Sequence, residues 1–221
     1  MKFLEKLPEL LMEDVNDSIF ATLRYLTHGM SGIRTAKILN EATRQLISKK
    51  ECYVEIGTYQ GFSLIAAGYQ NNVLCYGIDD LSMSDIYRNN ILAKQGVRDA
   101  LNYNLQFNLA LNCKFIENDF RKVQFENKSI GVLYIDGKHT YEEVKDTLCW
   151  SKPFLANEAL IIFDDVTTPG VGKAVLEYAN LSDIELVLFM KALMSENEKK
   201  YNQGRNLDSN IGNGLAICLK S

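Results

Sequence analysis

The sequence lacks the features that define secreted, membrane-spanning and zinc-binding proteins. Its five cysteines form no disulfide or zinc pattern, which predicts reduced, buried thiols in a cytoplasmic protein. No apolar run approaches the roughly 20 residues of a membrane span. Glu5 and Lys6 interrupt the apolar start that a secretory signal would need. We therefore expect no membrane contact.

The composition is typical of a globular domain with a sizeable core. Of the 221 residues, 47% are hydrophobic, and the net charge of −4 argues against a nucleic-acid-binding surface. There are no repeats or low-complexity tracts. We expect one domain, with residues 1–48 as an N-terminal helical cap and residues 49–221 as an α/β core. The sequence leaves a homo-oligomer possible.

Short apolar runs alternate with helical patterns along the core, which is typical of a parallel sheet built from βαβ units. Helices are expected near 61–69, 87–111, 141–152 and 170–179. Thr140 and Glu143 form a T-x-x-E capping box at the start of the third of these. The expected strands are Tyr53–Gly57, Val73–Asp79, Lys114–Asp119, Ile130–Asp136, Ala159–Asp165, Leu186–Met190 and Leu215–Leu219.

Two of the expected strands end on carboxylates. The run IGVLYID stops at Asp136, with His139 three residues later, and ALIIFDD stops at Asp164 and Asp165. Ligand sites in open α/β sheets lie beyond the carboxyl ends of the strands. Three acidic groups that meet there would repel one another unless a cation or a shared proton compensated them. The pattern predicts a metal site with a histidine beside it.

The first expected strand leads into the turn E-x-G-x-x-x-G-x-S, formed by residues 55–63. A dinucleotide fingerprint would need glycines where the chain has Tyr59 and Phe62. Glycines at such a turn let the backbone approach a ligand closely. Asp79 ends the second strand roughly 20 residues later, where an acidic side chain binds ribose hydroxyls.

The turn resembles motif I of class I S-adenosylmethionine (SAM) methyltransferases. The blocks IDGKHTYEEVKDTLCW and ALIIFDDVTTPGVGKAV resemble methyltransferase family 24, which is related to macrocin-type sugar O-methyltransferases and cephalosporin hydroxylase-like proteins. The second block is also similar to the acidic Pro-Gly turn of catechol O-methyltransferases. The resemblance implies a Rossmann-like class I methyltransferase fold, with a mostly parallel seven-stranded sheet, helices on both faces and an N-terminal helical extension.

The resemblance also implies roles for individual residues. Asp136, Asp164 and Asp165 are expected to hold Mg²⁺, or Mn²⁺ or Ca²⁺, and Asp136 and His139 to be catalytic. His139 occupies the position of the lysine base of catechol enzymes, and Asp119 the position near the adenine. The expected SAM-binding residues are Glu55, Gly57, Thr58, Gly61, Ser63, Asp79, Asp119 and Asp136.

The expected activity is O-methylation of a small polyhydroxylated acceptor, such as a sugar, a glycoside or a catechol-like natural product. A non-catalytic SAM-binding scaffold and a nicotinamide-dependent oxidoreductase remain alternatives. Some macrocin-type enzymes carry their base near the position of Thr167 and Thr168, where this chain has no ionisable group. Asp136 could instead cap the next helix, and one of Asp164 and Asp165 could hold a backbone N–H. The acceptor pocket is expected from the N-terminal helices and residues 81–90 and 195–213.

Overall fold

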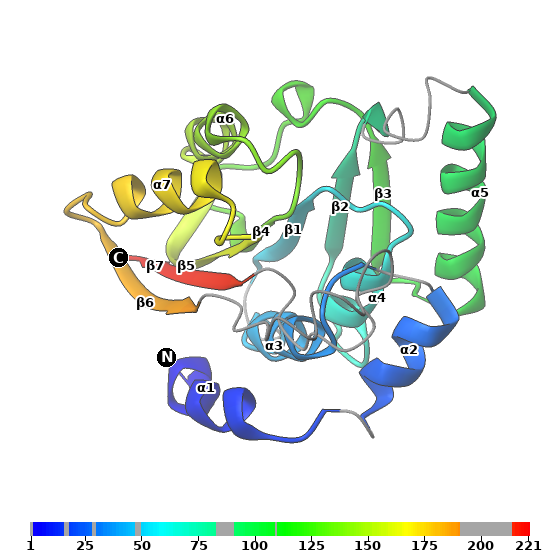
Figure 1. Cartoon of the computed structure of the whole chain (residues 1–221), viewed down its shortest axis with the longest axis horizontal. Helices are drawn as coiled ribbons and strands as arrows, with labels where there is room; N and C mark the ends of the chain where they lie inside the picture. The colour runs from blue at the N-terminus through cyan, green and yellow to red at the C-terminus, as the bar shows by residue number, and fades with distance from the viewer. Residues whose placement is uncertain are drawn as a thin grey trace.

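A single seven-stranded sheet forms the centre of the protein (Figure 1). The computed structural model describes residues 2–15, 18–27, 30–46, 50–82, 91–108, 110–190 and 214–221. The strand order is β3-β2-β1-β4-β5-β7-β6; β7 runs antiparallel to both β5 and β6, whereas the other neighbouring pairs are parallel. The strands are β1 Cys52–Ile56, β2 Cys75–Asp79, β3 Cys113–Glu117, β4 Ile130–Ile135, β5 Leu155–Asp164, β6 Ile184–Met190 and β7 Leu215–Lys220.

Helices cover both faces of the sheet, as expected for a doubly wound fold (Figure 1). The helices α6 and α7 lie on one face, whereas α1, α3 and α4 lie on the other, and α5 stands beside the edge strand β3. The bounds are α1 Lys2–Met12, α2 Ile19–Thr27, α3 Ile33–Arg44, α4 Phe62–Gly68, α5 Ile91–Phe107, α6 Tyr141–Ser151 and α7 Pro169–Tyr178, with a 3₁₀ turn at Phe120–Lys122.

The two faces of the sheet carry separate hydrophobic cores. On one face, Val144 of α6 and Val171 of α7 pack with strand residues such as Leu133 and Ile161. On the other face, Leu39 of α3 packs with the strand side chains that point to that side, which include the fully buried Tyr53 and Tyr134. β1 and β4 are buried along their whole length, which explains why β4 reads as an unbroken apolar run and why β1 is apolar apart from Glu55.

All seven expected strands are present, and their ends match the sequence pattern closely. β5 begins at Leu155, four residues before the expected start. The sequence pattern did not reveal these residues because the exposed Asn157 and Glu158 interrupt the apolar run. The expected helix near 87–111 corresponds to α5 in its described part. Residues 83–90 and 195–213, expected to help form the acceptor pocket, lie outside the described residues.

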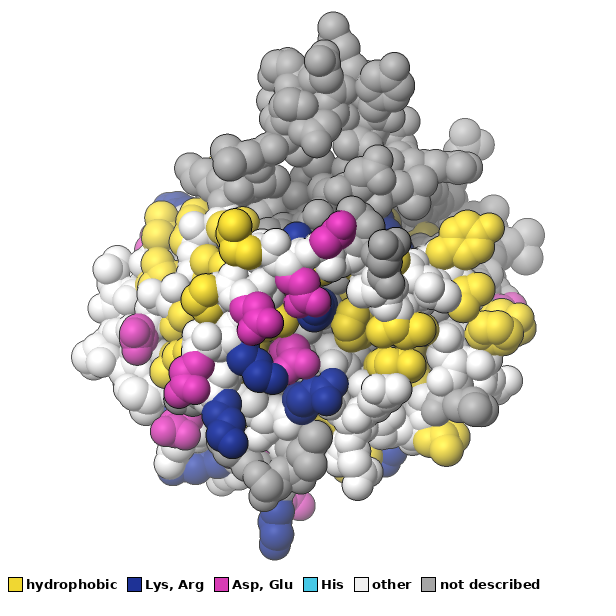
Figure 2. Space-filling model, turned by 90° about the horizontal axis from the view of Figure 1, so that it is seen from below, with side chains coloured by type: hydrophobic (Ala, Val, Ile, Leu, Met, Phe, Trp, Pro, Cys, Tyr) yellow, Lys and Arg dark blue, Asp and Glu magenta, His cyan; other side chains and the backbone are white. Residues whose placement is uncertain are grey.

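The N-terminal region forms three helices, as the sequence indicates. Phe3, Leu7 and Leu10 of α1 are buried against the core of the second face. The last of these helices, α3, begins at Ile33 and ends at Arg44. Figure 2 shows that acidic and basic side chains are interspersed on the face seen from below. The ion pair Lys6–Glu41 joins α1 to α3, and the ion pair Arg44–Glu41 lies within α3.

The expectation that the cysteines are buried thiols holds for four of the five. All five cysteines are free thiols, and four of them are buried, whereas Cys149 on α6 is exposed. Within the described residues, no helix combines the length and the apolar character needed to cross a bilayer.

Gly57, directly after β1, lies against the backbone that follows β4. Its φ is +91°, and a Cβ placed on it would be 2.0 Å from the carbonyl oxygen of Asp136. The adjacent strands are held in this register by hydrogen bonds from Asp136 N to Ile56 O and from Gly57 N to Ile78 O, both 2.9 Å. Only glycine permits this close approach, which sets the distance between the turn after β1 and the start of the turn after β4.

We predict that Gly57→Ala lowers the free energy of unfolding by about 2–5 kcal/mol, because it adds a left-handed alanine and a backbone clash. The matched control is Gly96→Ala on the exposed side of α5, where a Cβ meets no atom within 4 Å. That change should raise stability by about 0.5–1 kcal/mol. Urea unfolding of both variants measures the difference. Equal stabilities for Gly57→Ala and the wild type would show that the backbone contact is not tight.

Candidate functional site

The turns that follow β1, β2, β4 and β5 meet at one end of the sheet. We call this the carboxyl edge, and it comprises residues 57–61, 79–82, 136–140 and 165–168. Each turn contains a non-glycine residue with positive φ: Tyr59 at 47°, Leu81 at 54°, His139 at 52° and Asp165 at 54°. Such conformations are costly and concentrate at functional sites. The backbone therefore marks this edge as the candidate site.

Asp79 closes the turn after β1 onto the end of β2. Its Oδ2 accepts hydrogen bonds from the backbone N–H groups of Thr58 and Tyr59, each 3.0 Å long, and its Oδ1 accepts one from Leu81 N at 2.7 Å. An ionised carboxylate has about four acceptor positions, so capacity for a further donor remains. Asp79 thus holds the shape of the glycine turn, whether or not it also contacts a ligand.

Glu55 lies beneath this turn and is fully buried. Its carboxylate accepts hydrogen bonds from the Tyr53 hydroxyl at 2.7 Å and from the Ser63 hydroxyl at 3.3 Å. Burial raises the pKa of Glu55 to about 8, against the lowering effect of these donors. Glu55 and Ser63, both expected to bind SAM, are therefore in direct contact with each other, inside the core rather than at the surface.

Asp119, after β3, is engaged by a neighbouring arginine. Its carboxylate accepts hydrogen bonds from Arg121 Nε at 2.9 Å and Nη2 at 3.0 Å, and from Arg121 N at 3.0 Å. These hydrogen bonds hold the pKa of Asp119 below its ordinary value. Asp119 thus begins the 3₁₀ turn at Phe120–Lys122.

Asn104 of α5 is a site-supporting residue that sequence reasoning missed. Its side-chain amide donates to the carbonyl of Gln60 at 2.9 Å and to that of Thr27 at 3.3 Å. It therefore ties the turn after β1 to both α5 and α2. The sequence signal for this residue is an asparagine inside an expected helix, because asparagine is a poor helix former there.

Asp136 and Asp164, at the ends of β4 and β5, both contact the Tyr134 hydroxyl. The hydroxyl is 2.6 Å from Asp164 Oδ2 and 3.2 Å from Asp136 Oδ2. Burial and the charge of Asp165 raise the pKa of Asp164 to about 7. Burial, followed by the charges of Asp164, Asp165 and Glu55, raises the pKa of Asp136 well above its ordinary value. These two carboxylates lie close enough to repel one another when both are ionised.

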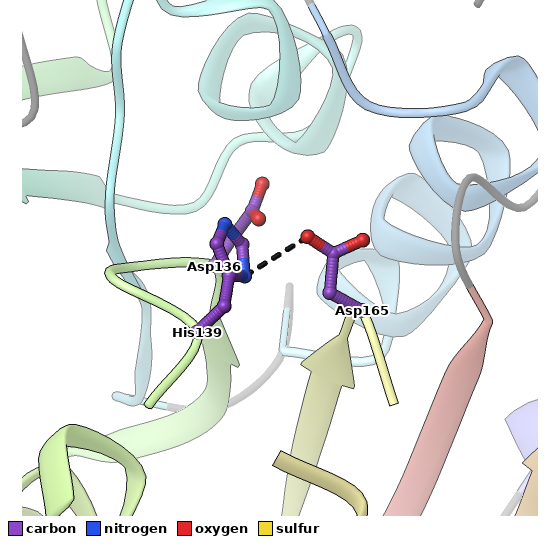
Figure 3. Close-up of side chains that lie close together, drawn as sticks. All are labelled: Asp136, His139 and Asp165. Carbon is purple, nitrogen blue, oxygen red and sulfur yellow. Dashed lines mark ion pairs between the residues drawn. The ribbon is translucent and has the colours of Figure 1, made fainter. Parts of the chain in front are cut away.

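His139 and Asp165 form a close pair across the carboxyl edge (Figure 3). His139 Nδ1 is 2.9 Å from Asp165 Oδ2. Burial lowers the pKa of His139, but the hydrogen bond and the charge of Asp165 outweigh it, so the net shift is upward. Sequence reasoning placed both residues at this edge without predicting that they pair.

The turn that carries His139 is held by the capping box of α6. Thr140 accepts a hydrogen bond from Glu143 N at 3.2 Å, as the T-x-x-E pattern predicts. The Glu143 carboxylate, however, accepts from Lys138 N at 2.6 Å, further back along the chain. The helix start therefore fixes the residue that directly precedes His139.

The described residues include one group of side chains suited to a metal ion: Asp136, His139 and Asp165. One potential ligand atom from each lies within 4.8 Å of the others. Asp164 is not in this group, since its Oδ1 accepts from Asp165 N at 2.9 Å and its Oδ2 faces Tyr134. Carboxylate oxygens suit Mg²⁺, Ca²⁺ and Mn²⁺, whereas an imidazole is a more usual ligand of transition-metal ions. The donor set fits a cation, with His139 added to the residues expected from the sequence.

The structure resembles solved methyltransferases over nearly its whole length. The O-methyltransferase TomG of Streptomyces achromogenes, in complex with SAM, has a TM-score of 0.61 at 14% identity, over 95% of this chain and 91% of that one. An O-methyltransferase of Bacillus cereus in complex with SAH has a TM-score of 0.58 at 12% identity, over 100% and 91%. A tRNA (m1A58) methyltransferase of Aquifex aeolicus has a TM-score of 0.52 at 17% identity, over 84% and 68%. These likenesses establish the fold.

The sequence comparison identifies the family. A search of curated proteins gives no significant match. The model of a methyltransferase domain, methyltransferase family 24, matches residues 54–166, just over half of the chain. The match runs from within β1 to just beyond β5 and spans Glu55, Asp79, Asp136, His139 and Asp165. The chain belongs to methyltransferase family 24 and is a class I SAM-dependent methyltransferase.

Proposed function

We propose that this enzyme transfers the methyl group of SAM to a hydroxyl oxygen of a small polyhydroxylated acceptor, with the help of a divalent cation. The acceptor class is a sugar, a glycoside or a catechol-like natural product. The observation that carries the proposal is the group Asp136, His139 and Asp165, whose ligand atoms lie within 4.8 Å of one another. Gly57, in the motif I turn, packs directly against the backbone of Asp136. A base, acidic ligands and a cofactor turn are therefore adjacent.

The turn after β1 is the proposed SAM site. The left-handed Gly57 and Gly61 give this turn a backbone shape that other residues adopt only with strain, and Gly57 lets it pack against the backbone of Asp136. Asp79 supports this turn and retains acceptor capacity for ribose hydroxyls. Thr58, Ser63 and the buried Glu55 complete the turn, and Asp119 and Asp136 are proposed to bound the cofactor. SAM supplies an activated methyl group, so the protein mainly has to align and deprotonate the acceptor.

The proposed metal ligands are Asp136 and Asp165, with Asp164 or His139 as the third. Convergent carboxylates that raise one another's pKa gain from a cation, because it removes their mutual repulsion. Oxygen ligands favour Mg²⁺, with Mn²⁺ or Ca²⁺ as alternatives. Such an ion lowers the pKa of an acceptor hydroxyl.

His139 is the proposed general base. With Nδ1 directed at Asp165, its Nε2 is the nitrogen available to take a proton from the acceptor. Asp165 would orient the ring and stabilise the imidazolium, as the carboxylate does in catalytic triads. A residue that accepts a proton in this way cannot use the same nitrogen to bind a metal.

The proposal also covers the class of the acceptor and a cytoplasmic location of the enzyme. A net charge of −4 and the interspersed charges of the face in Figure 2 favour a small molecule over nucleic acid. Free thiols agree with a cytoplasmic enzyme. Acceptor classes can be separated by incubating the enzyme with labelled SAM and a panel of sugars, glycosides and catechols. Transfer of label to none of these classes would contradict the proposed acceptor.

We predict that Asp79→Ala weakens SAM binding by about 1.5–3 kcal/mol, the range for hydrogen bonds to a charged group. Because Asp79 also supports the turn, Asp79→Asn, which keeps one acceptor oxygen, should weaken binding less. Asp80→Ala is the matched control. Asp80 accepts a hydrogen bond from Ser82 N and not from the turn after β1, so its substitution should leave the affinity unchanged. Calorimetry with SAM measures all three. Unchanged affinity for Asp79→Ala would remove Asp79 from the cofactor site.

We predict that exhaustive chelation abolishes methyl transfer and that Mg²⁺ restores it, because the acceptor hydroxyl then lacks its cation. Asp136→Asn and Asp165→Asn should each weaken Mn²⁺ binding, measured by calorimetry on the whole enzyme. Asp146→Asn serves as the control, because Asp146 is an exposed carboxylate on α6 that pairs with Arg121. Full activity after chelation, or equal Mn²⁺ affinity in all three variants, would refute a catalytic metal site.

We predict that His139→Ala lowers kcat by about 10²–10⁴ while SAM affinity stays the same, as expected for loss of a general base. The measurement is made at an Mg²⁺ concentration that saturates the wild type and again at higher concentrations, and Mn²⁺ affinity is determined in parallel. Lys138→Ala, which changes the preceding exposed side chain, is the control. Wild-type turnover in His139→Ala would show a structural role, and restored turnover at higher Mg²⁺ would show that His139 is a ligand instead.

A further inference from the structure

The hydroxyl of Tyr134 lies between the two carboxylates that end β4 and β5. Tyr134 is on β4 and has no exposed surface. Its oxygen is 2.6 Å from Asp164 Oδ2 and 3.2 Å from Asp136 Oδ2. Its ring packs in the core of the second face, with Leu160 and Ile162 of the neighbouring strand. A rigid group inside the core therefore reaches both acidic strand ends.

A second hydroxyl reaches the same oxygen of Asp136 from the N-terminal region. Ser31, between α2 and α3, donates to Asp136 Oδ2 at 3.3 Å. The carbonyl of Ser31 accepts a hydrogen bond from the buried Arg24 guanidinium, which holds this segment in place. Asp136 Oδ2 is thus occupied by protein hydroxyls, whereas no hydrogen bond to its Oδ1 is recorded among the described residues.

We propose that Tyr134, assisted by Ser31, is a positioning residue for the divalent cation. The proposal rests on the metal-assisted function proposed above. By engaging Oδ2 of Asp136, the two hydroxyls fix the rotation of that carboxylate and direct its other oxygen to a ligand. Tyr134 has a single hydroxyl hydrogen, which it shares between Asp164 Oδ2 at 2.6 Å and Asp136 Oδ2 at 3.2 Å, so it bridges the two carboxylates. Partners of this kind around a metal site set the orientation of the ligands and the affinity for the metal.

The geometry separates this role from simple filling of the core. A phenylalanine would occupy nearly the same volume, so packing does not require the hydroxyl. A buried tyrosine needs one hydrogen-bond partner, but Tyr134 reaches two carboxylates on different strands. Tyr53 on the adjacent strand β1 is equally buried and donates to a single carboxylate, Glu55, at 2.7 Å. Tyr53 is therefore a matched comparison for loss of one buried tyrosine–carboxylate bond.

The test compares Mn²⁺ binding to the full-length wild type, Tyr134→Phe and Tyr53→Phe by calorimetry, with thermal unfolding of each protein as a check on folding. Tyr134→Phe should bind Mn²⁺ about 10–100-fold more weakly, as is typical for loss of a partner of a metal ligand. Tyr53→Phe should bind Mn²⁺ as the wild type does, although both variants lose stability. Unchanged or tighter binding by Tyr134→Phe, or equal weakening in the two variants, would overturn the proposal.

A second pair of variants, at Ser31, tests the hydrogen bonding to the same oxygen of Asp136. These variants keep the proposal testable if Tyr134→Phe fails to fold. Ser31→Ala should weaken Mn²⁺ binding by about 3–10-fold, as for one lost hydrogen bond, and Ser31→Thr should restore it. Equal affinity in Ser31→Ala and the wild type would overturn the contribution of the hydroxyls at Oδ2. If the wild type itself binds no Mn²⁺, the metal-assisted function fails. If the wild type binds Mn²⁺ and the variants match it, only the positioning role fails.

Discussion

Repulsion among carboxylates at one edge of the sheet is the constraint on which the site depends. Asp136 and Asp164 end neighbouring parallel strands, Asp164 is buried and Asp136 is partly buried, and Asp165 follows at once. Like charges this close raise one another's pKa and oppose the folded state unless donors or a cation offset them. The fold supplies such donors in the hydroxyls of Tyr134 and Ser31, the backbone of Asp165 and the ring of His139.

The turns around these carboxylates are shaped by backbone conformations that are rare outside functional sites. Gly57 permits contact with the backbone of Asp136, and His139 and Asp165 both adopt positive φ. Hydrogen bonds from distant elements hold these turns in place, with Asn104 of α5 on one side and Glu143 of α6 on the other. A site for methyl transfer needs such rigidity, because most of its work is alignment of the acceptor with an already activated donor.

The sequence was sufficient to predict the strands and the carboxylates that end them. Buried parallel strands read as apolar runs, so the position of Asp136 after IGVLYI is visible without a structure. The pairing of His139 with Asp165 and the orientation of Asp164 toward Tyr134 were not predictable. These contacts join different strands, and a side-chain direction at a strand end depends on turn conformation rather than on residue pattern. Ser31 lies 105 positions from Asp136, and nothing in its local sequence indicates the contact.

We expect the carboxyl edge to bring a cofactor turn together with a cation held by strand-end carboxylates. Crystallography tests this arrangement most directly. Crystals grown with SAH and Mn²⁺ would locate both groups, since manganese gives an anomalous signal. The account predicts an anomalous peak beside the carboxylates of Asp136 and Asp165, with SAH along residues 57–61 and next to Asp79. An ordered SAH without manganese at these carboxylates, or a peak only elsewhere on the protein, would contradict it.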